Sequence, residues 1–156
     1  MAETEQEHLN RNLEQLLQEM RVVLPGVQVL FGFLLAVPFA QRFARVTDFQ
    51  RDVYFIALLL SALSTVLMLA LSIQHRILFH RAEKLYLIRV GNACMIAGMT
   101  AVALAITLSL VLVADFLFGG PLAWLAGIAA FVAFALLWYA MPIARRLRSR
   151  APAPPA

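Results

Sequence analysis

The sequence predicts an all-α membrane protein with four transmembrane helices and an N-terminal amphipathic helix. Hydrophobic residues make up 62% of the 156 residues, charged residues make up 14%, and the mean hydropathy is +0.80. This composition lies far outside the range of soluble proteins. Four apolar segments have lengths close to the roughly 20 residues that a helix needs to cross a bilayer core. The chain length accommodates one membrane domain with short connections, without a separate soluble catalytic domain.

Residues 1–21 are predicted to form an amphipathic helix in the cytoplasm. Steps of four and three alternate along its apolar stripe, as in a coiled-coil heptad, and the stripe consists of Leu9, Leu13, Leu16, Met20 and Val23. The polar face carries Glu14, Gln15, Gln18 and Glu19. Because a helix lying on an anionic membrane normally carries Lys and Arg on its polar face, we expect this helix to dock against protein and to continue into the first membrane segment.

The four membrane segments are expected at residues 22–40, 53–73, 93–114 and 121–142. Pro38 has no N–H group. It would therefore free the carbonyl of Leu34 from its helical hydrogen bond and bend the far end of the first segment.

Local signals predict where the later helices begin and end. Thr47 and Gln50 have the spacing of a capping box, so the second helix is expected to begin near Asp48. The sequence DFLFGG at residues 115–120 predicts a tight turn between the third and fourth segments. The basic, proline-rich residues 143–156 are expected to be disordered.

The distribution of basic residues predicts that both termini are cytoplasmic. The N-terminal segment, the connection at residues 74–92 and the C-terminus carry two, four and four Lys and Arg, which is ten of the 13 in the chain. The positive-inside rule places these three segments in the cytoplasm. Alanine is abundant and Lys84 is the single lysine, which resembles the coding of a GC-rich bacterial genome. The expected location is the bacterial plasma (inner) membrane.

The predicted spans contain no charged residue, and a charge at mid-membrane is the usual sign of an ion or proton pathway. Four candidates remain for an ion path: Gln28, Asp48, Asp52 and Asp115. For Gln28 we favour an interhelical hydrogen bond over a polar pore or substrate contact. Asp48 and Asp52 could form the acidic entrance of a cation pathway. A role in capping the start of the second helix explains them equally well and needs no ligand. Asp115 is expected to be an exposed loop acid.

Two groups of basic residues could contact anionic lipid headgroups or an acidic partner. Arg76, His80 and Lys84 share a helical face at steps of four, and Arg145, Arg146 and Arg148 follow the last span. For both groups we favour ordinary anchoring charge on the cytoplasmic side. We also expect the acidic face around Glu14 and Glu19 to pair with the first group, because both lie on the predicted cytoplasmic side.

Small residues predict close packing of the third and fourth helices as a hairpin. The third segment contains Ala93, Ala97, Ala101 and Ala105 at steps of four, with Gly98 nearby, and the fourth contains Gly127. The short connection between these segments would also force them together. Because alanine is common in this chain, some of these spacings are expected by chance.

The sequence contains no recognisable catalytic constellation. No span combines a serine with a nearby histidine or acid, HExxH and a glycine-rich phosphate loop do not occur, and Cys94 is the single cysteine. We therefore expect no enzymatic activity, no cofactor and no metal site. The basic residues cluster beside the apolar segments, so membrane lipid is a more suitable partner than nucleic acid.

The stretch LLQEMRVVLPGVQVLFGFLLAVPF, from Leu16 to Phe39, resembles a bacterial family of small four-span membrane proteins of unknown function. The likeness continues through Arg42-Phe43, Gln50-Arg51, Tyr54, His75-Arg76 and Phe79. Members of this family are often labelled sodium:proton antiporters, so the resemblance implies a four-span fold and cation exchange. The sequence departs from that chemistry because it lacks a mid-membrane carboxylate.

These observations lead to two functional hypotheses. The first is a non-enzymatic interaction or assembly component that acts through helix packing, as a homo-oligomer or with a membrane-protein partner. The alternative is a cation/proton antiporter or channel whose pathway forms only in an oligomer.

Overall fold

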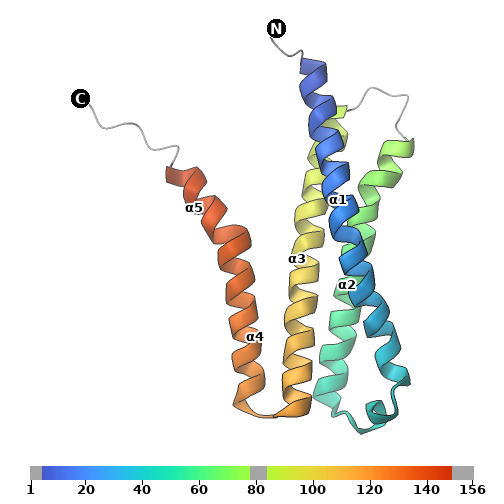
Figure 1. Ribbon diagram of the computed structural model, residues 1–156, viewed down its shortest axis with the longest axis vertical. Coiled ribbons are helices and arrows are strands. Elements are labelled where there is room, and N and C mark those ends of the chain that lie inside the picture. The colour runs from blue at the N-terminus through green and yellow to red at the C-terminus, as the bar shows by residue number, and fades with distance from the viewer. Residues whose placement is uncertain (1–4, 78–83, 149–156) are drawn as a thin grey trace, which may run out of the picture.

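The computed structural model describes residues 5–77 and 84–148, and the described residues are helical apart from short connections (Figure 1). The main helices are α1 (Glu5–Ala36), α2 (Asp48–Ile77), α3 (Lys84–Leu117), α4 (Pro121–Phe134) and α5 (Met141–Arg148). The 3-10 turns η1 (Val37–Phe39) and η2 (Gln41–Arg45) join α1 to α2, and the π-helical segment η3 (Ala135–Ala140) joins α4 to α5.

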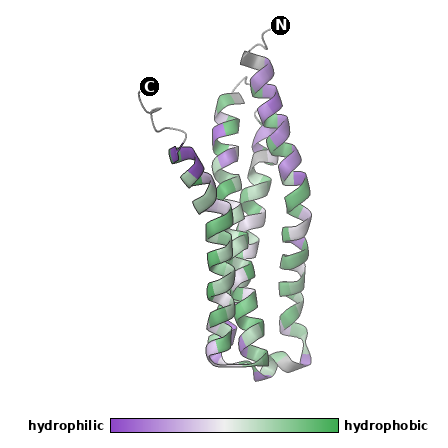
Figure 2. Ribbon diagram, turned by 60° about the vertical axis from the view of Figure 1, so that its left-hand side comes forward, coloured by the Kyte–Doolittle hydropathy of each residue, from purple (hydrophilic) through white to green (hydrophobic). Residues whose placement is uncertain are grey.

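Among the residues that the structure describes, four helices are long and apolar enough to cross a membrane, as predicted. They cover Glu7–Phe39, Asp48–Ile77, Leu85–Leu117 and Pro121–Arg148. Figure 2 shows the hydrophobic residues along the middle of the bundle, with hydrophilic residues gathered at the start of α1 and in α5. The chain therefore has the architecture of a multi-pass membrane protein.

The helices are arranged as a three-helix bundle with a fourth helix at its side (Figure 1). α3 packs most extensively against α2, and α1 lies against both of them, whereas α4 packs mainly against α3. The start of α1, the end of α2, the start of α3 and the end of α5 lie at one end of the molecule (Figure 1). The two short connections lie at the other end. Towards the end that holds the start of α1, α4 and α5 lean away from the bundle.

α1 is one continuous helix, so the predicted amphipathic segment continues into the first span, as expected, and is not a separate helix. Its buried side chains are spaced by seven residues, at Leu13, Met20, Val27 and Leu34. The heptad stripe predicted before residue 23 thus continues through the apolar half. Pro25 lies inside the helix on its exposed side.

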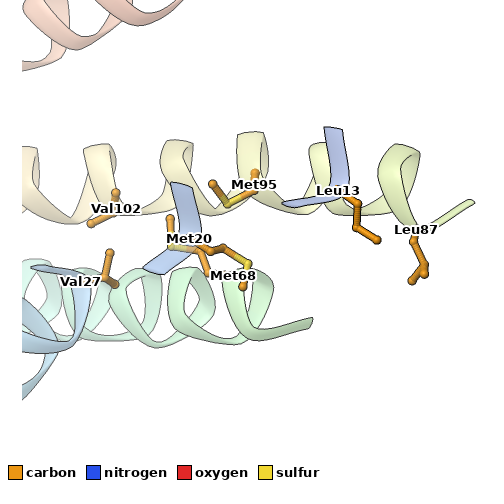
Figure 3. Close-up of a cluster of buried hydrophobic side chains, with 7 residues drawn as sticks. All are labelled: Leu13, Met20, Val27, Met68, Leu87, Met95 and Val102. Atoms are coloured by element: carbon orange, nitrogen blue, oxygen red, sulfur yellow. The ribbon is translucent and has the colours of Figure 1, made fainter. Parts of the chain in front are cut away.

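A cluster of buried side chains holds α1 against its neighbours (Figure 3). Leu13, Met20 and Val27 of α1 meet Met68 of α2 and, from α3, Leu87, Met95 and Val102. Three of the seven are methionines, whose flexible side chains fill irregular gaps between helices. The apolar stripe of the predicted docking helix is therefore occupied by helices of the same chain.

The connection between α1 and α2 shows the two features that the sequence predicted there, the Thr47/Gln50 capping box and the effect of Pro38. The Thr47 N–H donates to Gln50 Oε1 at 3.1 Å, and the Gln50 N–H donates to Thr47 Oγ1 at 3.2 Å. This capping box is the predicted one, and α2 begins at Asp48. The carbonyl of Leu34, which Pro38 cannot reach with an N–H, accepts a hydrogen bond from the Tyr54 hydroxyl at 3.0 Å.

Two helix ends differ from what the local signals in the sequence indicated. α3 extends over residues 84–117 and so continues beyond both ends of the predicted span at 93–114. The turn before α4 is therefore shorter than the predicted 115–120, and it contains Gly119 and Gly120 with positive φ. Residues 143–148 are helical instead of disordered, because η3 supplies a wider helical turn just before Pro142, where the Met141 N–H donates to the carbonyl of Leu136. The basic residues of α5 also suit the negative end of a helix dipole. The rest of the predicted tail lies outside the described residues.

Candidate functional site

Gln28 lies on the exposed side of α1, within the first candidate span. Within the described part of the chain, its side chain makes no hydrogen bond. The interhelical hydrogen bond that we favoured from the sequence is therefore not made inside one chain. On the same helical face lie Pro25, Gly32 and Ala36, which are also exposed. A Cβ added to Gly32 would meet no heavy atom of a neighbouring element within 4 Å.

Asp48 and Asp52 are exposed in the first turns of α2. Asp48 forms an ion pair with Arg51, with 3.0 Å between Asp48 Oδ1 and Arg51 Nη1. Both partners are largely exposed, so this pair contributes little to stability.

The expectation that Asp115 is an exposed loop acid is wrong. Because α3 continues to Leu117, Asp115 lies in its last turn and is half-buried. Its Oδ2 accepts a hydrogen bond from Gln50 Nε2 at 2.8 Å. The amide of the buried Gln50 thus serves both the capping box and Asp115, and this contact joins the start of α2 to the end of α3.

The four candidate ion-path residues are not brought together. The three acids lie at the end of the bundle where α2 begins, whereas eight residues separate Gln28 from Ala36 at the corresponding end of α1. Eight helical residues span about 12 Å. Within residues 5–77 and 84–148, no group of three or more His, Cys, Asp or Glu side chains could hold a metal ion.

The basic residues are spread over three helices. Arg76 is exposed near the end of α2, and Lys84 is the first residue of α3, so these two belong to different helices rather than to one stripe. His80 lies outside the described residues. Among the described side chains, no ion pair joins Glu14 or Glu19 to Arg76. The predicted pairing with His80 and with the Lys84 side chain lies outside the described residues and stays a prediction. Arg145, Arg146 and Arg148 are exposed on α5.

The predicted small-residue face of α3 is only partly buried. Ala101 and Ala105 are buried, whereas Ala93 and Ala97 are exposed. Gly98 faces α2, because a Cβ at this position would lie 3.1 Å from Met68 Cγ and 3.4 Å from the carbonyl oxygen of Ser64.

The third and fourth helices pack against each other as the predicted hairpin, and Gly127 lies at their contact. A Cβ added to Gly127 would overlap Val111 of α3. Ala123 of α4 is also buried. The absence of a side chain at Gly127 therefore allows α4 to approach α3.

A groove with a volume of about 710 Å³ lies between α1, α3 and η3, and the sequence did not reveal it. Its apolar wall includes Val23, Met95 and Met99. η3 contributes Trp138 and Tyr139, and the rim carries Gln15, Gln18, Glu19 and Asn92. Trp138 and Tyr139 at the end of the fourth span are the part of this groove that could be noticed in the sequence. The groove also depends on the tilt of α4 away from the bundle, which the sequence of one segment does not predict.

A hydrogen bond between α3 and η3 closes the far end of this groove. The Thr100 hydroxyl lies 2.7 Å from the carbonyl of Ile96 and 2.6 Å from the Tyr139 hydroxyl. A hydroxyl has one proton to donate, and Thr100 donates it to Ile96, so Tyr139 is the donor to Thr100. Beyond this pair lies a second cavity of about 300 Å³, lined by side chains such as Thr107 and Phe131.

The comparisons with known proteins identify a family for this chain but no activity. The family model that matches residues 2–142 is described as a family of unknown function, DUF6328. No curated protein and no solved structure gives a significant match. The family description states no transport activity, so cation exchange stays a prediction. Because the family model covers nearly the whole sequence, the chain belongs to the DUF6328 family of unknown function.

Proposed function

We propose that the protein is a non-enzymatic assembly component of the bacterial plasma membrane, with both termini in the cytoplasm. It would act by packing against a second copy of itself through the side of α1 that carries Gln28. The observation that carries this proposal is that the Gln28 amide has no hydrogen-bonding partner among the described residues and lies on an exposed helix face within a candidate membrane span.

The depth of Gln28 makes its lack of a partner costly. It lies seven residues beyond Arg21, the last charged residue before the apolar part of α1, and seven helical residues span about 10 Å. The hydrocarbon core contains no water to bind an exposed amide. An unsatisfied amide there costs about 2–7 kcal/mol relative to water. A neighbouring protein helix would remove this cost.

A second copy of α1 suits this face because a primary amide both donates and accepts hydrogen bonds. In a two-fold symmetric contact, the same residue of each copy meets its counterpart, so two Gln28 side chains can satisfy each other. Gly32 and Ala36, one and two turns further on, have little or no side chain. They would let two helix backbones approach closely.

The cytoplasmic placement of the termini is supported by the basic residues. Arg145, Arg146 and Arg148 of α5 lie at the same end of the molecule as the start of α1 (Figure 1). A cytoplasmic position for this end follows the positive-inside rule.

Förster transfer between labelled copies in liposomes would test the proposed contact. We expect the wild-type protein to show transfer that depends on the protein-to-lipid ratio, with Gln28→Leu weakening association about threefold to twentyfold, the effect of roughly 0.6–1.7 kcal/mol for one interhelical hydrogen bond. Gly32→Leu should also weaken association, because its side chain would keep the backbones apart.

Gly26→Leu provides the matched control. Gly26 is also an α1 glycine with open space around an added Cβ, but six residues separate it from Gly32, which places it about 120° away around the helix. Association should therefore be unchanged in Gly26→Leu. A monomeric wild type, or equal loss in both glycine variants, would contradict the proposed contact.

A further inference from the structure

The groove between α1, α3 and η3 combines two chemical environments, as an amphiphile does. Its inner wall is apolar, with Val23, Met95 and Met99, while its rim carries Gln18, Glu19 and Asn92. A volume of about 710 Å³ falls in the range of small-molecule sites, which is about 300–1,000 Å³. The groove is therefore large enough for a ligand and has a polar side for a headgroup.

The groove leads towards a second apolar space. Tyr139 borders both the groove and the cavity of about 300 Å³ beyond it. The hydrogen bond from Tyr139 to Thr100 separates the two spaces. A flexible hydrocarbon chain could lie along the apolar wall up to this pair, whereas a compact polar ligand would leave that wall unfilled.

The charge of the rim selects the headgroup. Among the described residues that line the groove, Glu19 is the one charged side chain, and it would repel an anionic headgroup. The same groove presents the rings of Trp138 and Tyr139, whose faces attract ammonium groups. The amides of Gln18 and Asn92 can donate hydrogen bonds to phosphate oxygens.

We propose that this groove binds a phospholipid with an ammonium headgroup, in which Glu19 contacts the ammonium and the amides of the rim contact the phosphate. The acyl chains lie against the apolar wall formed by α1 and α3. This site is separate from the Gln28 face of α1, so either proposal can fail without the other.

Native mass spectrometry of the protein from mixed micelles would test the site, using equal amounts of dioleoyl phosphatidylethanolamine and dioleoyl phosphatidylglycerol. We expect one retained phosphatidylethanolamine with about a threefold preference over phosphatidylglycerol, the size of effect expected from one partly exposed charge contact. Glu19→Gln should abolish the preference while some lipid is still retained. Trp138→Ala should lower retention of both lipids, because it removes part of the groove wall.

Glu14→Gln is the matched control, because Glu14 is exposed on the same helix but does not line the groove. It should keep the wild-type preference. Equal retention of the two lipids by the wild type, no retention of either, or an unchanged preference in Glu19→Gln would each overturn the proposal.

Discussion

Ser61 and Ser64 lie one turn apart on α2 and are both fully buried, but their hydroxyl groups have different surroundings. Ser64 Oγ donates to the carbonyl oxygen of Gly98 on α3 at 2.8 Å. Ser61 Oγ has no hydrogen-bonding partner among the described residues. The glycine at position 98 allows the first contact, because a side chain there would press against Met68.

This difference predicts that replacement by alanine changes the stability of the protein differently at the two positions. Ser64→Ala should lower the free energy of unfolding by about 0.5–1 kcal/mol, because it removes an interhelical hydrogen bond. Ser61→Ala should leave stability unchanged or raise it, because it removes a buried hydroxyl that has no partner. Unfolding of both variants in mixed micelles, followed by circular dichroism, would measure the two values. Equal destabilisation by both would show that the hydroxyl groups are equivalent.

At the scale of the helices, α4 packs closely against α3 where Gly127 lies on Val111. Gly127→Ala should destabilise the protein by about 1–3 kcal/mol, because the added methyl group overlaps Val111 and forces the helices apart. The double variant Gly127→Ala/Val111→Ala should recover most of this loss, because the shortened side chain makes room for the methyl group. A double-mutant cycle of apparent Tm values in detergent would measure the coupling. Purely additive effects would show that the two positions do not meet.

The elements that sequence could predict are those with local signals. Thr47 and Gln50 carry a capping box within one turn, and the effect of Pro38 on the Leu34 carbonyl follows from proline chemistry alone. Both features are present in the structure. The partner of that carbonyl, Tyr54, could not be predicted, because the contact depends on how α2 lies beside α1.

Other features depend on the packing of helices that are apolar on every side. α4 is hydrophobic around its whole circumference, so its sequence does not indicate which face meets α3. The bond between Gln50 and Asp115 links residues 65 positions apart, and no spacing rule predicts it. For this reason the prediction that Asp115 is exposed was wrong, and the groove beside Tyr139 was not predicted at all.

At the scale of the whole molecule, the proposed contact face and the proposed lipid site lie on different helix surfaces. Gln28 faces away from the buried heptad positions of α1, while Glu19 lines the groove shared with α3 and η3. A second copy on the Gln28 face would thus leave the groove open to lipid. The alternative function is cation/proton exchange. It would require that Asp48, Asp52 and Asp115, which lie at the opposite end of the bundle from the start of α1, take part in transport.

Sodium-dependent proton flux in proteoliposomes that contain a pH-sensitive dye distinguishes these functions. We expect flux equal to that of empty liposomes, because the Asp115 carboxylate already accepts the hydrogen bond from Gln50 that joins α2 to α3. Asp115→Asn keeps an oxygen that can accept this bond, so the variant should fold, and Asp52→Asn controls for loss of an exposed carboxylate. Flux that disappears in Asp115→Asn but persists in Asp52→Asn would contradict the assembly proposal and establish cation exchange.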